Sequence, residues 1–209
     1  LHTLPVVYGA DVANVAGPRA PGTAALLVAD PTSDLPHARL EIAAAAPGWA
    51  DDRPLITLRE KDATRRALLE AMPQARSLHF AGHARFSGTS DFDSGLVLAD
   101  GDVTVGDILA LEAVPEHVVL TACDAARTPA QSLTEGWGIA HAFLVKGTRV
   151  VIAPTRPVSD ELALTFADLF YSELAANDGD VVAAARSAQL RILHDSPGLD
   201  WAAFRVLSP

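Results

Sequence analysis

Short, uninterrupted apolar runs recur along the chain, and segments long enough for helices separate them. The clearest runs are residues 23–29 (TAALLVA), 76–81 (RSLHFA), 117–120 (HVVL) and 148–153 (TRVVIA). A run of this kind, without polar alternation, predicts a strand buried on both faces, which is typical of a parallel sheet covered by helices. The sequence therefore predicts an α/β fold whose central sheet is mostly parallel.

Helical patterns and one hairpin fill the intervals. The expected helices are one that follows Pro31 and ends at Pro47-Gly48, and others at 63–72, 105–111, 134–145, 159–176 and 180–194. We expect Asp34 or Ser33 to cap the first helix and Asp62 to cap the second. Asp100-Gly101 lies between two alternating runs, which is a strong hairpin signal. Further strands are expected at 55–58 and within 200–207.

The first residues differ in composition from the rest of the chain. Residues 1–22 combine a short apolar run with a Gly/Pro-rich segment, which predicts an N-terminal arm or edge strand followed by a linker. The main domain is expected at 23–209. Because the chain starts with a leucine and its only methionine is Met72, we expect it to be a piece of a longer protein.

Charge and cysteine content narrow the function classes. The formal net charge of −10, without a Lys/Arg cluster, argues against nucleic acid and against anionic membrane surfaces. No apolar run approaches the roughly 18 residues of a membrane span. One cysteine cannot form an internal disulfide, so we expect a reducing compartment such as the cytoplasm. The scarcity of lysine beside abundant arginine and alanine suggests a bacterial genome.

Two reactive side chains follow two of the apolar runs. His83 comes just after the run that ends at Ala81, and Cys123 comes just after the run that ends at Leu120. Because the carboxyl ends of parallel strands meet at one edge of a sheet, both side chains are expected there. A neighbouring histidine activates a thiol as a nucleophile and later protonates the leaving amine. A lone cysteine is also a common core residue, and this alternative stays open.

His79 precedes His83 by four residues, but we do not expect the two to share a metal ion. On a strand, side chains four residues apart share a face at about 13 Å separation, which is too far for one ion. His79 is expected to pack in the core or on the sheet face. Trp137 and Trp201 are expected to be core residues as well.

Six blocks, taken in order, resemble the CHAT domain, a family of caspase-like cysteine peptidases more distantly related to separase and the caspases. The blocks are LHFAGHARF, SGLVLADGDVTVGDILAL, HVVLTACDAA, GWGIAHAFLVKGTRVVIAP, PVSDELALTFADLFYSEL and DWAAFRVL. The resemblance covers residues 23–207. It implies a three-layer αβα sandwich and a cysteine endopeptidase without cofactor or metal. His83 would be the catalytic histidine and Cys123 the nucleophile, working as a dyad.

The resemblance also bears on the residues around this pair. Backbone N–H groups of Ala84 and Cys123 are the expected oxyanion donors. The family usually has glycine directly after the histidine, where this chain has Ala84. The N–H survives that change, but a backbone angle that only glycine adopts would not.

Asp30, Thr121 and Arg156 are the expected substrate-binding residues. In caspase-like folds, the position of Asp30 can contribute to the pocket for the residue before the scissile bond, and an acid there favours a basic substrate residue. Arg156, which stands where many members have tryptophan, favours an acidic one instead. Helix capping is the alternative role for Asp30.

Two other functions remain open at this point. Ala84 and Arg156 also suit a non-catalytic interaction module that kept the fold. A small-molecule-binding doubly wound domain shares the strand pattern, although no Gly-rich phosphate loop follows the first buried run. The resemblance further implies a protein or peptide substrate, a role in bacterial regulated proteolysis or defence, and control by an upstream or separate sensor region such as TPR repeats.

Overall fold

The computed structural model of the chain describes residues 6–9, 22–49, 53–85, 91–122 and 138–209. Its strands are β1 (Val7–Gly9), β2 (Ala24–Ala29), β3 (Leu55–Arg59), β4 (Ala75–Ala81), β5 (Ala84–Arg85), β6 (Gly95–Leu98), β7 (Gly101–Thr104), β8 (His117–Leu120), β9 (Val150–Pro154) and β10 (Phe204–Ser208). Its α-helices are α1 (Ala38–Trp49), α2 (Arg65–Ala71), α3 (Val105–Ala110), α4 (Ile139–Val145), α5 (Asp160–Ala176) and α6 (Val181–Asp195).

Seven strands form the central sheet in the order β1-β10-β9-β8-β4-β2-β3. Every neighbouring pair is parallel except β9 with β10. The predicted mostly parallel sheet is therefore confirmed. β1 comes from the expected N-terminal arm and forms an edge of this sheet. β5, β6 and β7 make a separate antiparallel sheet, and Leu98 pairs with Gly101 across the predicted hairpin.

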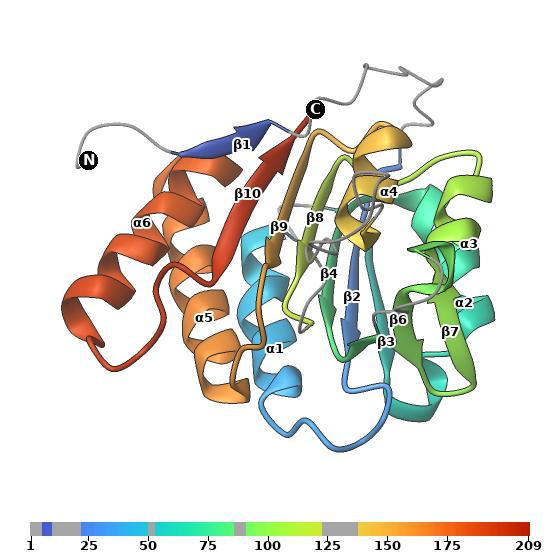
Figure 1. Cartoon of the computed structure of the whole chain (residues 1–209), viewed down its shortest axis with the longest axis horizontal. Helices are drawn as coiled ribbons and strands as arrows, with labels where there is room; N and C mark the ends of the chain where they lie inside the picture. Colours follow the sequence, from blue (N-terminus) through green and yellow to red (C-terminus); the bar gives the residue numbers. More distant parts are fainter. Residues whose placement is uncertain (1–5, 10–21, 50–52, 86–90, 123–137) are drawn as a thin grey trace.

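Helices cover both faces of the central sheet, which gives three layers (Figure 1). α1, α5 and α6 pack on one face around a core that includes Phe166, Phe170 and Phe204. α2, α3 and α4 pack on the other face around Phe80 and Phe143. All six residues of β2 are buried, as expected for a strand in the middle of such a sheet. None of the helices in the described part of the chain has the length and apolar character that a bilayer crossing requires.

Three predictions about helix ends are wrong: the cap of α2, the end of α1 and the cap of α1. Asp62 lies in a 3₁₀ turn, Glu60–Asp62, whereas the Thr64 hydroxyl accepts the Ala67 N–H at 3.2 Å and caps α2. α1 continues through Pro47 to Trp49, because Trp49 is held edge to face against Tyr171 with ring centroids 5.2 Å apart.

The predicted cap of α1 is also wrong. The Asp34 carboxylate accepts hydrogen bonds from Thr32 and His83 instead, and α1 begins four residues later, at Ala38. The predicted cap of the helix at 134–145 lies outside the described residues, and the described part of that helix is α4.

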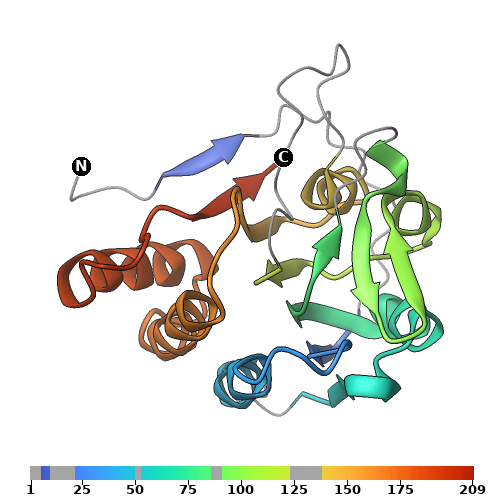
Figure 2. The same cartoon turned by 60° about the horizontal axis from the view of Figure 1, so that its bottom comes forward.

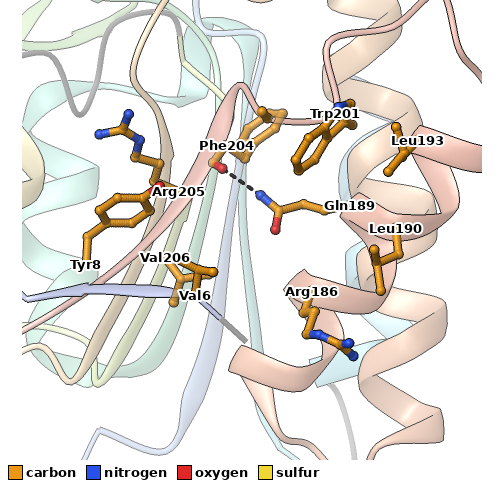
Figure 3. Close-up of a pocket in the computed structure, with 11 residues that line it drawn as sticks. Val6, Tyr8, Arg186, Gln189, Leu190, Leu193, Trp201, Phe204, Arg205 and Val206 are labelled. Carbon is orange, nitrogen blue, oxygen red and sulfur yellow. Dashed lines mark hydrogen bonds between the residues drawn. The ribbon is translucent and has the colours of Figure 1, made fainter. Parts of the chain in front are cut away.

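A cavity of about 520 Å³ lies between α6 and the β1–β10 edge (Figure 3). Its walls include Trp201, Leu190 and Val206, and the guanidinium of Arg205 lies 4.4 Å from the centroid of the Tyr8 ring. Trp201 is 41% exposed, so the prediction that it is a core residue is wrong. It lies in the turn that leads into β10, and its ring covers the pocket instead of entering the core. Trp137 lies outside the described residues.

Candidate active site

The ends of β4 and β8, after which the two predicted catalytic residues follow in the sequence, lie side by side in the sheet. The strands are parallel neighbours, and Phe80 is paired with Leu120. His83 and Cys123 each come three residues after their member of this pair. Cys123 itself lies outside the described residues.

Thr121 joins the two strand ends just before Cys123. Its backbone N–H donates to the Phe80 carbonyl at 3.0 Å, and its hydroxyl donates to the same oxygen at 3.2 Å. The side chain is almost fully buried. Thr121 was predicted to bind substrate, and its hydroxyl here fixes the end of β8 against β4.

His83 lies at the junction between the central sheet and the small antiparallel sheet. Its carbonyl accepts the N–H of Val97, and the next residue, Ala84, starts β5 and pairs with Leu96. Ala84 is not among the residues with positive φ, so its backbone is one that alanine adopts without strain. The loss of glycine at this position therefore imposes no backbone cost.

Gly82 allows the turn after β2 to approach this histidine. A Cβ atom at Gly82 would lie 2.8 Å from the Phe80 ring and 3.2 Å from the ring of Pro31, closer than such atoms normally approach. The glycine is thus required by a close contact. As a result, the segment after β2, which runs along the lower edge of Figure 1, lies against the tip of β4.

The His83 ring contacts a carboxylate that sequence reasoning did not assign to the site. Nε2 of His83 lies 3.0 Å and 3.1 Å from the two carboxylate oxygens of Asp34. His83 is 39% exposed and Asp34 is 59% exposed, so the pair faces solvent at the edge of the sheet. A hydrogen bond from the Thr32 hydroxyl, followed by the one from His83, holds the pKa of the Asp34 carboxyl below its usual value.

Asp30 is fully buried at the tip of β2 and has the positive φ of 50°. Its Oδ1 accepts the backbone N–H groups of Asp34 and Leu35 at 2.8 and 2.9 Å, and its Oδ2 lies 3.2 Å from Nη2 of Arg39. Both oxygens are engaged, so Asp30 holds the turn that leads to α1. To bind substrate, it would have to leave these partners.

Arg156 follows β9 on the same sheet edge but pairs with Asp200, which precedes β10. Its Nη2 lies 2.6 Å from Oδ1 of Asp200, and both side chains are exposed. The hydrogen bonds that Arg156 donates to Asp200 raise the pKa of the Arg156 guanidinium and lower the pKa of the Asp200 carboxyl. Among the described residues, Asp30 is paired with Arg39 and Arg156 with Asp200, so the two residues with conflicting expected substrate preferences belong to separate ion-pair clusters.

His79 lies deep below this edge and has two partners of its own. Its Nδ1 lies 2.8 Å from the hydroxyl of Tyr171, and its Nε2 lies 3.2 Å from Oε2 of Glu41. All three side chains are buried, which confirms the predicted packing role of His79. Burial raises the pKa of the Tyr171 phenol well above its ordinary value.

The comparison with family models decides the classification. The model of the CHAT domain matches residues 9–209. The chain belongs to the CHAT domain family. The six sequence blocks, all strands of the central sheet except the start of β1, and the paired strand ends lie within the matched region.

Solved structures place the CHAT domain among caspase-like folds. Separase in the Saccharomyces cerevisiae separase–securin complex is similar with a TM-score of 0.63 and 16% identity, over 89% of this chain and 12% of the separase chain. RgpB in the complex of Porphyromonas gingivalis RgpB pro- and mature domains is similar with a TM-score of 0.58 and 12% identity, over 91% of this chain and 48% of that chain. The predicted caspase-like three-layer sandwich is thus confirmed. No curated protein sequence matches the chain.

The CHAT domain spans only a small part of separase and about half of RgpB, and identities this low show the fold alone. What the site can do chemically must therefore come from its own residues. In the described part of the site, a solvent-facing imidazole with a carboxylate on one ring nitrogen stands beside the strand that leads to a thiol. Figure 2 shows this edge of the sheet from below.

Proposed function

We propose that this CHAT domain is a cysteine endopeptidase in which Cys123 is the nucleophile and His83 the general base and acid. The observation that carries the proposal is the register of β4 and β8. Because Phe80 and Leu120 are paired and the strands are parallel, residues the same distance beyond them emerge next to each other. Neighbouring strands are about 4.8 Å apart, which suits a thiol–imidazole contact across the gap.

The chemistry follows from the two side chains. The imidazole of His83 takes the thiol proton of Cys123, and the sulfur forms a bond with the carbonyl carbon of the substrate. The carbonyl oxygen takes the displaced electron pair and is stabilised by the backbone N–H groups of Ala84 and Cys123. When this tetrahedral intermediate breaks down, the carbonyl re-forms and the C–N bond breaks, and His83 gives its proton to the leaving amine. Water, deprotonated by His83, then hydrolyses the thioester and frees the thiol.

The proposed substrate is a protein or peptide segment that crosses the edge formed by the strand tips. Arg156 borders this edge and is the exposed candidate for contact with substrate. Asp30 supports a preference for a basic residue less well, since it has no exposed surface. We extend the proposal to a bacterial, cytoplasmic setting in which an upstream or separate sensor region, such as TPR repeats, controls access to the site.

The test is covalent labelling with peptidyl acyloxymethyl ketones, which transfer the peptidyl ketone to an activated thiolate and release a carboxylate. A library with basic, acidic and apolar residues next to the reactive ketone is applied to wild type, Cys123→Ala and His83→Ala. We expect an adduct that mass spectrometry maps to Cys123 and that is lost in His83→Ala. A general thiol reagent serves as the control for access to Cys123.

If the general reagent reacts with Cys123 but no peptidyl probe does, the peptidase proposal fails. The interaction-module hypothesis then replaces it. If an adduct forms equally well in His83→Ala, the assignment of His83 as the base is wrong.

A further inference from the structure

We propose that Asp34 is the positioning residue of His83. It fixes the imidazole in the tautomer with the proton on Nε2, so that Nδ1 is the nitrogen that accepts the proton of the nucleophile. The inference deepens the proposed peptidase function and rests on it for its catalytic meaning. Its structural content, the tautomer and orientation of one ring, can be tested without any activity.

The contact itself selects the tautomer. The Asp34 carboxylate approaches Nε2 with both oxygens, at 3.0 and 3.1 Å. An ionised carboxylate only accepts hydrogen bonds, so the ring nitrogen that faces it must carry the proton. In the neutral ring, Nδ1 then has the free lone pair. A base for a thiol proton needs such a lone pair.

Asp34 is suited to this role at neutral pH. The hydrogen bond from the Thr32 hydroxyl contributes most to the lowering of its pKa, and the His83 ring adds to the same effect. The carboxylate is therefore charged under the conditions in which the imidazole must take up a proton. A charged acceptor strengthens the hydrogen bond and stabilises the imidazolium that forms during catalysis.

The backbone of Asp34 is held by a buried side chain, which separates this pair from an ordinary surface ion pair. Oδ1 of Asp30 accepts the N–H of Asp34 at 2.8 Å, and Asp30 is fully buried. The backbone N–H of Asp30 donates to the carbonyl of Ala81, two residues before His83, at 2.9 Å. Asp30 thus links the turn that carries Asp34 directly to the end of β4, two residues before His83.

A second link between the same two segments lies in the core. Glu41, in the first turn of α1, contacts Nε2 of His79 on β4. The segment from Asp34 to Glu41 is therefore held at both ends, by His83 just after β4 at the surface and by His79 on β4 in the interior. A positioning group must be held within fractions of an ångström by its surroundings, and these two attachments provide that support.

The decisive experiment measures the tautomer of His83 by ¹⁵N NMR of histidine-labelled protein, at a pH where the ring is neutral. The His83 signals are assigned by their loss in His83→Gln. In wild type we expect the Nε2–H form. In Asp34→Ala we expect a mixture of the two neutral forms, because the acceptor is gone. Glu70→Gln is the control, since it removes an exposed carboxylate that pairs with Arg66 on α2, on the other face of the sheet.

Kinetics on a peptide substrate identified by the labelling library give the second readout. Asp34→Ala is expected to lower kcat by about 10- to 100-fold, less than the loss of general acid–base catalysis itself, which is worth about 10²- to 10⁴-fold. KM and the melting temperature should stay close to wild type. Asp34→Asn, whose amide oxygen can still accept from Nε2–H, should recover part of the rate and of the Nε2–H population.

An unchanged tautomer in Asp34→Ala would overturn the inference, as would an unchanged kcat in an active enzyme. If wild type neither reacts with peptidyl probes nor cleaves peptides, the peptidase proposal fails on its own, and the NMR result still decides whether Asp34 positions His83.

Discussion

Two histidines, His79 on β4 and His83 just after this strand, each contact a carboxylate from the segment that connects β2 with α1 or begins α1. His79 and Glu41 are buried, whereas His83 and Asp34 are both more than a third exposed. The Nε2–oxygen distances are similar, 3.2 Å in the interior and 3.0 Å at the edge. The same histidine–carboxylate pair thus occurs twice, with similar distances but with very different burial.

This difference in burial determines what each histidine–carboxylate pair can do. His79 has both ring nitrogens occupied, by Tyr171 and Glu41, and no solvent reaches it. Both nitrogens are engaged in the interior, so His79 serves the fold. The contact between His83 and Asp34 uses Nε2 alone, at an edge open to solvent. Interior burial makes a histidine–carboxylate pair structural, whereas a position at the strand tips leaves it available for proton transfer.

The largest expected effect comes from breaking the interior pair. Glu41→Ala should destabilise the protein by about 3–5 kcal/mol, because removal of one partner leaves the other buried without compensation. Urea unfolding followed by circular dichroism measures the change. Glu41→Gln keeps the volume and one acceptor, and should cost less. If Glu41→Ala costs no more than Asp34→Ala, burial does not distinguish the two pairs.

A smaller loss is expected from the other partner of His79. Tyr171→Phe removes only the hydroxyl 2.8 Å from Nδ1 and keeps the ring that packs against Trp49. An unsatisfied buried nitrogen costs about 1–3 kcal/mol. Tyr8→Phe is the matched control, because the Tyr8 ring is 41% exposed and its substitution should change stability little. Equal losses in the two variants would show that the Tyr171 hydroxyl is not part of the network.

His141 extends the comparison to a half-buried histidine whose Nδ1 has no hydrogen-bond partner among the described residues. Burial lowers the pKa of its imidazole. Between that lowered value and the ordinary one near about 6.5, the unfolded chain binds more protons than the folded one. The stability that His141 contributes is therefore complete above this window and is lost as the pH falls through it.

Unfolding free energies at pH 7.5 and 5.5 test this expectation. Wild type should lose more stability between the two values than His141→Gln does. His194→Gln, at an exposed histidine in the last turn of α6, should behave as wild type. An identical pH dependence in wild type and His141→Gln would contradict the assignment.

The smallest effect on stability is expected at the exposed pair. Asp34→Ala should change the unfolding free energy by less than about 1 kcal/mol, since solvent screens an exposed ion pair. Added salt should reduce even this difference. Differential scanning fluorimetry at low and high salt is sufficient to detect it. A loss as large as that of Glu41→Ala would mean that Asp34 is structural and not a positioning residue.

The sequence predicted most of the fold because its signals are local. The apolar runs specify the buried strands, and Asp100-Gly101 specifies the hairpin, through patterns that span a few residues. Errors arose where a tertiary contact overrode a local rule. α1 passes Pro47 because Trp49 packs on Tyr171, and Thr64 replaces Asp62 as a cap because the 3₁₀ turn ends before it.

The sequence indicated part of the candidate site. His83 and Cys123 follow from strand ends, but Asp34 was interpreted as a helix cap, and Glu41 was not singled out. Their partners lie on β4 or just after it, far along the chain, and the contacts depend on how β2 and β4 are aligned. One signal was available for Glu41: it is a charged residue on the apolar stripe of α1, beside Ala38, Ile42 and Ala45, and such a residue needs a buried partner.

The pairing of β1 with β10 has a consequence for the order of folding. Val7 lies beside Val206, so the first described strand, β1, pairs with the last, β10. Contacts of such large sequence separation carry the greatest loop-closure cost and form late. During synthesis from the N-terminus, β1 emerges long before its partner exists. Until β10 has emerged from the ribosome and paired, the exposed apolar residues Val6, Val7 and Tyr8 are an open strand edge that a chaperone or a neighbouring nascent chain can bind.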